Sequence, residues 1–231
     1  MKNIKIGILL LCIMLVIGCN QKDGEKSSFT DIEVWDSVKV STNHYDYSHF
    51  MYNYPESKFF DTALVRYFKY QEKLYDSIGP PMWDCFNRCI SVMVTKNDSV
   101  LFEHHPILIE NLNKSSLVYL MNENNNEMMP EQKLVKDKNG LERYVSDGFF
   151  YLQTDLKSND KLRQSITEIK LAYKNYKNYL AQNWFKMEFD KLGFEKKELI
   201  DNIVTQRIEL GKYYEIKIVD EELNNEDILN E

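Results

Sequence analysis

One apolar stripe runs through residues 159–184 and gives the chain its longest periodic pattern. Its members are Leu162, Ile166, Ile169, Tyr173, Tyr176, Leu180 and Trp184. They recur every three or four residues, which places them on one face of a single α-helix. Burying such side chains contributes about 1.5 to 3 kcal/mol each, so we expect this helix to pack against a sheet. The apolar run 149-FFYL-152 is typical of a strand in that sheet. An exposed tyrosine row could bind sugars or peptides, but this spacing favours core packing.

The remaining residues of this helix form a start signal and a basic face. Ser158 or Asn159 can cap its N-terminus, and Asp160 complements the positive end of its dipole. The face opposite the stripe carries the basic residues Arg163, Lys170, Lys174 and Lys177. This face is available to a partner, although we expect it to be mainly solvated.

The first half of the chain predicts a helical hairpin followed by a β-hairpin. Residues 44–77 carry apolar residues at helical spacing on both sides of Pro55, and 79-GPP-81 closes the segment. Alternating apolar residues in 90–96 and 100–104 flank a polar turn, which predicts two paired strands. Pro106 can then open a helix through Leu112, and residues 115–121 fit either a helix or a strand.

The second half predicts strands and helices in alternation. Asn139-Gly140 marks a turn within 132–146. A helix is expected at 194–207 and a last strand at 213–219. This order predicts an α+β fold, a small mixed sheet with packed helices, preceded by a short helical hairpin.

The N-terminus has the organisation of a secretory signal peptide. Lys2 and Lys5 precede an apolar run, and 16-VIG-18 before Cys19 resembles the lipobox of bacterial lipoproteins, whose cysteine is acylated. As a helix, Ile4 to Gly18 would reach only ~22 Å, against a hydrocarbon core of ~30 Å. The segment 20-NQKDGEK-26 resembles the export tags of Bacteroidetes lipoproteins. We therefore expect an envelope protein anchored by lipid on Cys19, in the outer membrane, facing the periplasm or the surface.

The charge of the chain limits its partners. The formal net charge is −7, and it becomes −9 when Lys2 and Lys5 leave with the signal peptide. An acidic chain without a basic stripe is a poor nucleic-acid binder, so we expect no such partner. Its negative field favours cationic partners such as Lys-rich peptides.

Two cysteines remain after Cys12 and Cys19 are assigned to the signal and the anchor. Cys85 and Cys89 could form a disulfide outside the cytoplasm if the chain between them bends, or they could remain two buried thiols. Redox or metal chemistry is disfavoured because three residues separate them instead of two.

The histidines form no convincing metal or catalytic cluster. In Glu103-His104-His105, adjacent histidines on a strand point to opposite faces and cannot both ligate one ion. His44 and His49 are five residues apart, off the spacing that shares a helical face. The sequence contains no nucleophile elbow, zinc motif, phosphate loop or dinucleotide fingerprint. We therefore expect a non-catalytic protein without metal or other cofactors.

Three segments carry a family resemblance, namely 130-PE-131, 167-TEIKLAYKNYKN-178 and 185-FKMEFDKL-192. They resemble the periplasmic domain of the ExbD/TolR family, in the long form found in Bacteroidetes. There a Pro-Glu pair leads to a strand, an acidic turn, a helix of pattern NELxxAYNELRN and a segment FGKxFxxL. Residues 90–112 resemble the first hairpin and helix of that family, so the resemblance covers about residues 86–216.

The resemblance implies a domain that dimerises and contacts TonB-like partners or, in TolR relatives, the cell wall. ExbD-type proteins serve TonB-dependent transport through a membrane helix with an essential aspartate, whereas residues 4–18 contain no Asp or Glu. We therefore expect an interaction module accessory to TonB-type transport, not a proton-conducting subunit, which could form a homodimer or bind TonB- or ExbB-type proteins. The alternative is a structural lipoprotein that binds peptidoglycan or another glycan.

These observations divide the chain into five segments. They are the signal peptide 1–18, a flexible tether 19–30, the helical hairpin module 31–84, the ExbD-like α+β domain 85–220 and an acidic tail 221–231.

Overall fold

A computed structural model describes five stretches of the chain. They are residues 29–79, 89–124, 126–136, 140–154 and 159–212. The signal peptide, Cys19, most of the tether, Cys85, the predicted strand 213–219 and the acidic tail lie outside them.

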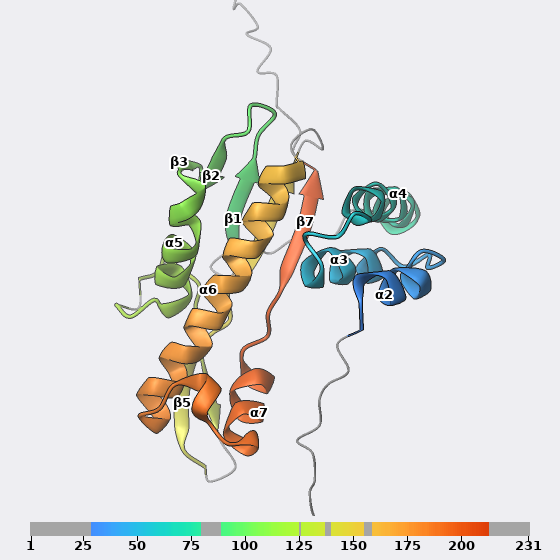
Figure 1. Cartoon of the computed structure of the whole chain (residues 1–231). Helices are drawn as coiled ribbons and strands as arrows, with labels where there is room; N and C mark the ends of the chain where they lie inside the picture. The colour runs from blue at the N-terminus through green and yellow to red at the C-terminus, as the bar shows by residue number, and fades with distance from the viewer. Residues whose placement is uncertain (1–28, 80–88, 125, 137–139, 155–158, 213–231) are drawn as a thin grey trace, which may run out of the picture.

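A five-stranded mixed sheet, in the order β3-β2-β1-β6-β7, organises the molecule (Figure 1). Its strands are β1 (Cys89–Val94), β2 (Val100–Phe102), β3 (His105–Ile107), β6 (Phe149–Thr154) and β7 (Ile208–Lys212). Strand β2 pairs antiparallel with β1 on one side and with β3 on the other. Strand β6 pairs parallel with β1 on one side and with β7 on the other. The fold is therefore α+β with a mixed sheet and packed helices, as the sequence predicts.

Two helices, α5 (Ile109–Met121) and α6 (Asn159–Phe185), cover one face of this sheet (Figure 1). Six of the seven residues in the apolar stripe of α6 are buried, and Trp184 at its end is partly buried. The tyrosines of the stripe also hydrogen-bond inside the core. The Tyr176 hydroxyl accepts from the Ser146 amide at 2.8 Å, and the Tyr173 hydroxyl donates to the Arg207 carbonyl at 3.1 Å. The tyrosine row is thus part of the core, as predicted.

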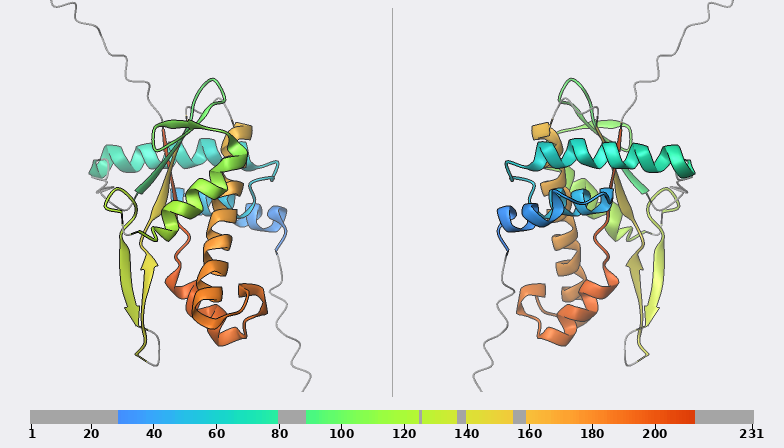
Figure 2. Two further views of the ribbon diagram at one scale, coloured as in Figure 1. Left: turned by 90° about the vertical axis from the view of Figure 1, so that its left-hand side faces the viewer. Right: turned by 90° about the vertical axis from the view of Figure 1, so that its right-hand side faces the viewer.

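A second, two-stranded sheet extends beyond the lower end of the first (Figure 2). It consists of β4 (Gln132–Lys136) and β5 (Glu142–Ser146). The guanidinium of Arg143 lies 4.7 Å from the centre of the Trp184 ring, which ties this hairpin to the end of α6. The 3-10 helix η1 (Phe189–Lys191) and helix α7 (Phe194–Ile203) lead from α6 to β7.

Three helices near the N-terminus form a unit that we call the helical module, residues 29–79. They are α2 (Asp31–Val38), α3 (His44–Asn53) and α4 (Phe60–Ile78). The hairpin predicted around Pro55 is confirmed as α3 and α4. Helix α2 is additional, and a capping box between Thr30 and Glu33 begins it at the end of the predicted tether. Trp35 of α2 stacks on Phe59 at 5.1 Å and so joins α2 to the hairpin.

The helical module packs beside β7 and binds α6 through the face expected to be solvated (Figure 1). Arg163 donates to the carbonyls of Pro55 and Ser57 at 2.7 and 3.0 Å. Lys170 donates to the Tyr52 carbonyl at 2.8 Å. The expectation of a solvated basic face was wrong for these residues, because backbone carbonyls of a distant segment reach them. Lys177 likewise pairs with Asp201 of α7 at 2.7 Å, and Lys174 is exposed.

Two predicted boundaries differ from the structure. Pro106 lies in edge strand β3 and does not open a helix; α5 begins at Ile109 and continues through the ambiguous segment 115–121. An edge strand tolerates proline because its outer side needs no backbone donor. The helix predicted at 194–207 ends at Ile203, residues 204–207 form neither helix nor strand, and β7 begins at Ile208.

Candidate functional site

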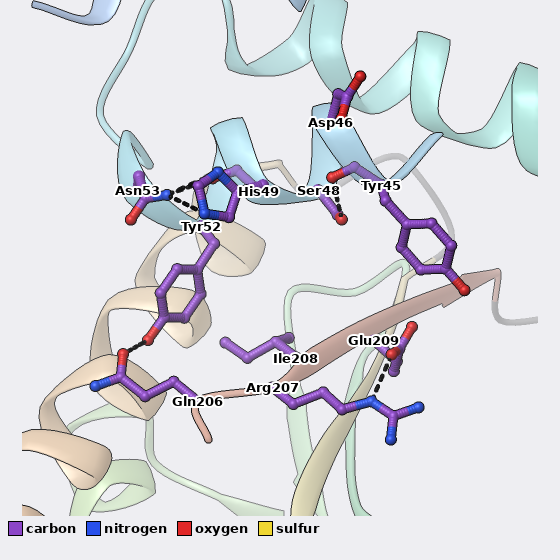
Figure 3. Close-up of a pocket in the computed structure, with 10 residues that line it drawn as sticks. All are labelled: Tyr45, Asp46, Ser48, His49, Tyr52, Asn53, Gln206, Arg207, Ile208 and Glu209. Atoms are coloured by element: carbon purple, nitrogen blue, oxygen red, sulfur yellow. Dashed lines mark hydrogen bonds and ion pairs between the residues drawn. The ribbon is translucent and has the colours of Figure 1, made fainter. Parts of the chain in front are cut away.

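A groove separates α3 of the helical module from β7 of the sheet (Figure 3). We call it the α3–β7 groove, and its volume is about 670 Å³. It is lined by Tyr45, Asp46, Ser48, His49, Tyr52 and Asn53 of α3, by Gln206 and Arg207 just before β7, and by Ile208 and Glu209 of β7. This volume lies within the range of about 300 to 1,000 Å³ that is common for ligand sites.

The α3 wall follows from helical geometry. Asn43 caps the helix by accepting from the Tyr45 amide at 3.1 Å. Tyr45, His49 and Tyr52 then lie four and three residues apart and face the same side. The opposite side of α3 carries the buried residues Tyr47 and Phe50, which pack inside the helical module. The wall is therefore the polar and aromatic face of an amphipathic helix.

The β7 wall is fixed from beneath by α6. Besides its bond to the Arg207 carbonyl, the buried Tyr173 hydroxyl lies 3.4 Å from the Arg207 amide. The Arg207 side chain lies over the Phe149 ring at 4.3 Å and donates to the Glu209 carboxylate at 2.7 Å. These contacts hold the charged pair at one position along the groove (Figure 3).

Several polar side chains of the groove have hydrogen-bond partners within it or at its rim. Tyr52 donates to the Gln206 side chain across one end of the groove. Asp46 accepts from the Ser41 hydroxyl at 2.5 Å. The Ser48 hydroxyl donates to the Tyr45 carbonyl at 2.9 Å, so it is not bonded to a base that could activate it.

Burial shifts the titration of two groups that border the groove. Burial raises the pKa of the Tyr52 hydroxyl well above its ordinary value. His44, packed against the Tyr67 ring at 5.5 Å, has a pKa lowered by burial, which the nearby Glu209 carboxylate opposes. Burial thus favours the neutral form of both groups. Asp46, Glu209 and Arg207 are the carboxylate and guanidinium groups that line the groove.

The structure does not bring the residues singled out in the sequence together. Cys89 begins β1, but Cys85 and Cys19 lie outside the described residues, so the disulfide and the lipid anchor stay predictions. Glu103 accepts from the Ser91 amide at 2.5 Å, and His104 follows it in a left-handed turn with φ 67°. Burial raises the pKa of the Glu103 carboxyl, which the bond from Ser91 opposes.

The remaining histidines also lie apart. His44 is buried in the helical module, whereas His49 is exposed in the groove. Within the described ranges, no three His, Cys, Asp or Glu side chains are grouped so that they could hold a metal ion.

No family model, curated protein or solved structure matches this chain. The groove is therefore the main guide to what the chain binds. Among the helices of the described residues, none combines the length and the apolarity that crossing a bilayer requires.

Sequence reasoning missed the α3–β7 groove because its two walls are far apart along the chain. Tyr52 and Gln206, which meet across it, are separated by 154 residues. A weak signal exists in α3, where tyrosines occur on both helical faces although one face is enough for the core. The surplus tyrosines Tyr45 and Tyr52 are the ones that line the groove.

Proposed function

We propose that this chain is a non-catalytic, lipid-anchored protein of the bacterial envelope that recognises a partner protein through the α3–β7 groove. The observation that carries the proposal is the groove itself, an open site with aromatic and charged walls. Four of its hydroxyl and carboxylate side chains are already hydrogen-bonded to neighbours, namely Asp46, Ser48, Tyr52 and Glu209. Such a site offers shape and charge to a ligand without an activated nucleophile.

The ExbD-like segments supply the partner class. They support a role beside TonB-type transport, with TonB- or ExbB-type proteins as candidate partners and a second copy of the chain as another. The helical module, residues 29–79, lies outside the resemblance, so the groove would add a recognition surface to an ExbD-like domain. The lack of Asp and Glu in residues 4–18 supports an accessory role over a proton-conducting one.

Co-purification from detergent-solubilised membranes tests this function. We expect the native protein to retain TonB, ExbB or a receptor component, and the variant Ser48→Arg, which fills the groove, to lose it. Tyr144→Ala is the matched control, because Tyr144 is 64% exposed on β5, away from the groove. Native protein that retains none of these components contradicts the proposal.

Binding of peptidoglycan or another glycan is the second candidate. It is favoured by Tyr45, which is 53% exposed in the groove close to Asp46 and Glu209. Exposed aromatic rings beside hydrogen-bonding carboxylates are suited to holding sugar rings. We expect the native chain and the control variant Tyr144→Ala to bind isolated sacculi. The variant Tyr45→Ala should fail to bind them. Equal recovery of both variants excludes this role for the groove.

A further inference from the structure

The outer edge of β7 differs along its length. Strand β7 is the last strand of the five-stranded sheet, and the Phe150 amide donates to the Arg207 carbonyl at 3.1 Å. In a parallel ladder, the backbone groups of alternate residues face the same neighbour. Those of Arg207 and Glu209 therefore face β6, whereas those of Ile208 and Leu210 face away from the sheet.

Among the outward backbone groups of these two residues, the helical module bonds the carbonyl of Leu210. The Leu210 carbonyl accepts from the Tyr67 hydroxyl at 2.9 Å and from the Gln71 side chain at 3.2 Å. Among the described residues, none hydrogen-bonds to the outward amide or carbonyl of Ile208. Ile208 is half-buried, and it lines the α3–β7 groove. A backbone donor and acceptor at this depth require a partner, which is either water or a ligand.

We propose that an extended peptide segment of a partner protein pairs with β7 at Ile208 and becomes a sixth strand beneath α3. This inference rests on the proposed function and specifies how the groove recognises its partner. Addition of a strand to a free sheet edge supplies main-chain hydrogen bonds, while pockets beside the edge select side chains. The four residues from Gln206 to Glu209 span ~13 Å at about 3.3 Å per residue, which fits a segment of four or five residues.

The walls of the groove favour a basic segment. Asp46 and Glu209 contribute two carboxylates against the single guanidinium of Arg207. The formal net charge of the whole chain is −7, which also attracts a basic segment. Tyr45 and Tyr52 flank the free edge (Figure 3) and can pack on the stem of a Lys or Arg side chain.

Hydrogen exchange on the full chain in detergent tests the pairing directly. The probe is the acetylated and amidated pentapeptide Lys-Val-Thr-Val-Lys, and its control is the same peptide with alternate amides N-methylated. We expect saturating peptide to slow exchange of the Ile208 amide at least tenfold, and the methylated control to give no protection. Absence of binding at millimolar peptide, or equal protection by the methylated control, overturns the proposal.

Two variants separate backbone pairing from other modes of binding. Ile208→Pro removes the outward N–H while the bonds of Arg207 and Glu209 to β6 remain, and we expect at least a tenfold loss of peptide affinity. Ser48→Arg blocks the groove without changing the strand, so its loss of peptide affinity places the peptide in the groove. If the proline variant does not fold, the N-methylated peptide still tests the backbone pairing, because it keeps the side chains and lacks the alternate amide donors. Protection of the groove by chitotetraose, but not by the peptide, also overturns the proposal in favour of a glycan.

The same variants distinguish this inference from the proposed function. If an envelope component co-purifies equally with native chain and Ile208→Pro but is lost from Ser48→Arg, the groove binds a partner and strand pairing is wrong. If no component co-purifies with the native chain, the proposed function itself fails.

Discussion

The two edges of the five-stranded sheet are protected in different ways. At one edge, β3 is three residues long and contains Pro106, which has no backbone N–H to offer another strand. At the other edge, β7 is five residues long, and the side chains of Tyr67 and Gln71 cover part of it. One edge is thus closed by its own composition and the other by a tertiary contact. Only the second can change its accessibility when a neighbouring element moves.

The largest expected effect on stability comes from removing Tyr67, the side chain that covers the β7 edge at Leu210. Tyr67→Ala deletes a buried ring and its bond to the Leu210 carbonyl, so we expect the free energy of unfolding to fall by about 3 to 5 kcal/mol. Urea denaturation followed by circular dichroism measures this loss. The exposed Tyr144→Ala should stay within about 0.5 kcal/mol of the native chain. Similar losses in both variants would mean that Tyr67 does not hold the edge.

A smaller loss is expected from Gly211→Ala in β7. A Cβ at this position would overlap the ring and hydroxyl of Tyr151 on the neighbouring strand. Overpacking of this kind costs about 1 to 3 kcal/mol, measured by the same denaturation. Tyr151→Val should recover part of that loss in the double variant, because it removes the obstructing ring. Strictly additive effects of the two substitutions would show that the contact between them is not responsible.

Acidification should also lower the stability of the region where the helical module covers the β7 edge. Burial holds the pKa of His44, next to Tyr67, below its ordinary value, so the unfolded chain binds the His44 proton more readily than the folded chain. The stability contributed by neutral His44 is fully present above about pH 6.5 and is lost as pH falls from there towards the lowered pKa.

Thermal melting between pH 8 and pH 5 measures this effect. We expect His44→Phe to show a smaller decrease in melting temperature over that range than the native chain. At pH 8 His44 is neutral in the folded and in the unfolded chain. The difference in melting temperature between the native chain and His44→Phe at this pH therefore reports packing alone, and it serves as the reference. Equal pH dependence in the two proteins would contradict the assignment to His44.

The smallest effect on stability, but a distinct one on association, is expected at the β3 edge. Pro106→Val should change the free energy of unfolding by less than about 0.5 kcal/mol, because Pro106 is exposed and pairs only with Leu101. Its added N–H makes the edge available to another strand, so sedimentation should show more self-association. If the variant remains as monodisperse as the native chain, Pro106 does not protect this edge.

Local patterns predicted the elements whose stabilising contacts are periodic. The stripe from Leu162 to Trp184 identified α6, and alternation identified the β1–β2 hairpin, because one buried face imposes a repeat on the sequence. The same reasoning failed at Pro106. A proline can open a helix or end a sheet, and only the neighbouring strand decides which.

The candidate site was beyond this kind of prediction. Arg163 and Lys170 have the spacing of a solvated helical face, yet they bind carbonyls of a segment more than a hundred residues earlier. The edge of β7 is free at Ile208 because the Tyr67 hydroxyl bonds the carbonyl of Leu210, two residues further along the strand. No periodicity in the sequence records such contacts, because each involves only a few individual residues.

The bond between Tyr67 and Leu210 also bears on the order of assembly. It joins positions 143 residues apart, whereas α3 and α4 need only each other to form their hairpin. During synthesis the helical module is complete long before β7 exists, and it must wait for the last strand of the sheet to dock. Contacts of such long range form slowly. Docking of the module is therefore expected to be a late step in folding, and until then both sides of this interface are open to other chains.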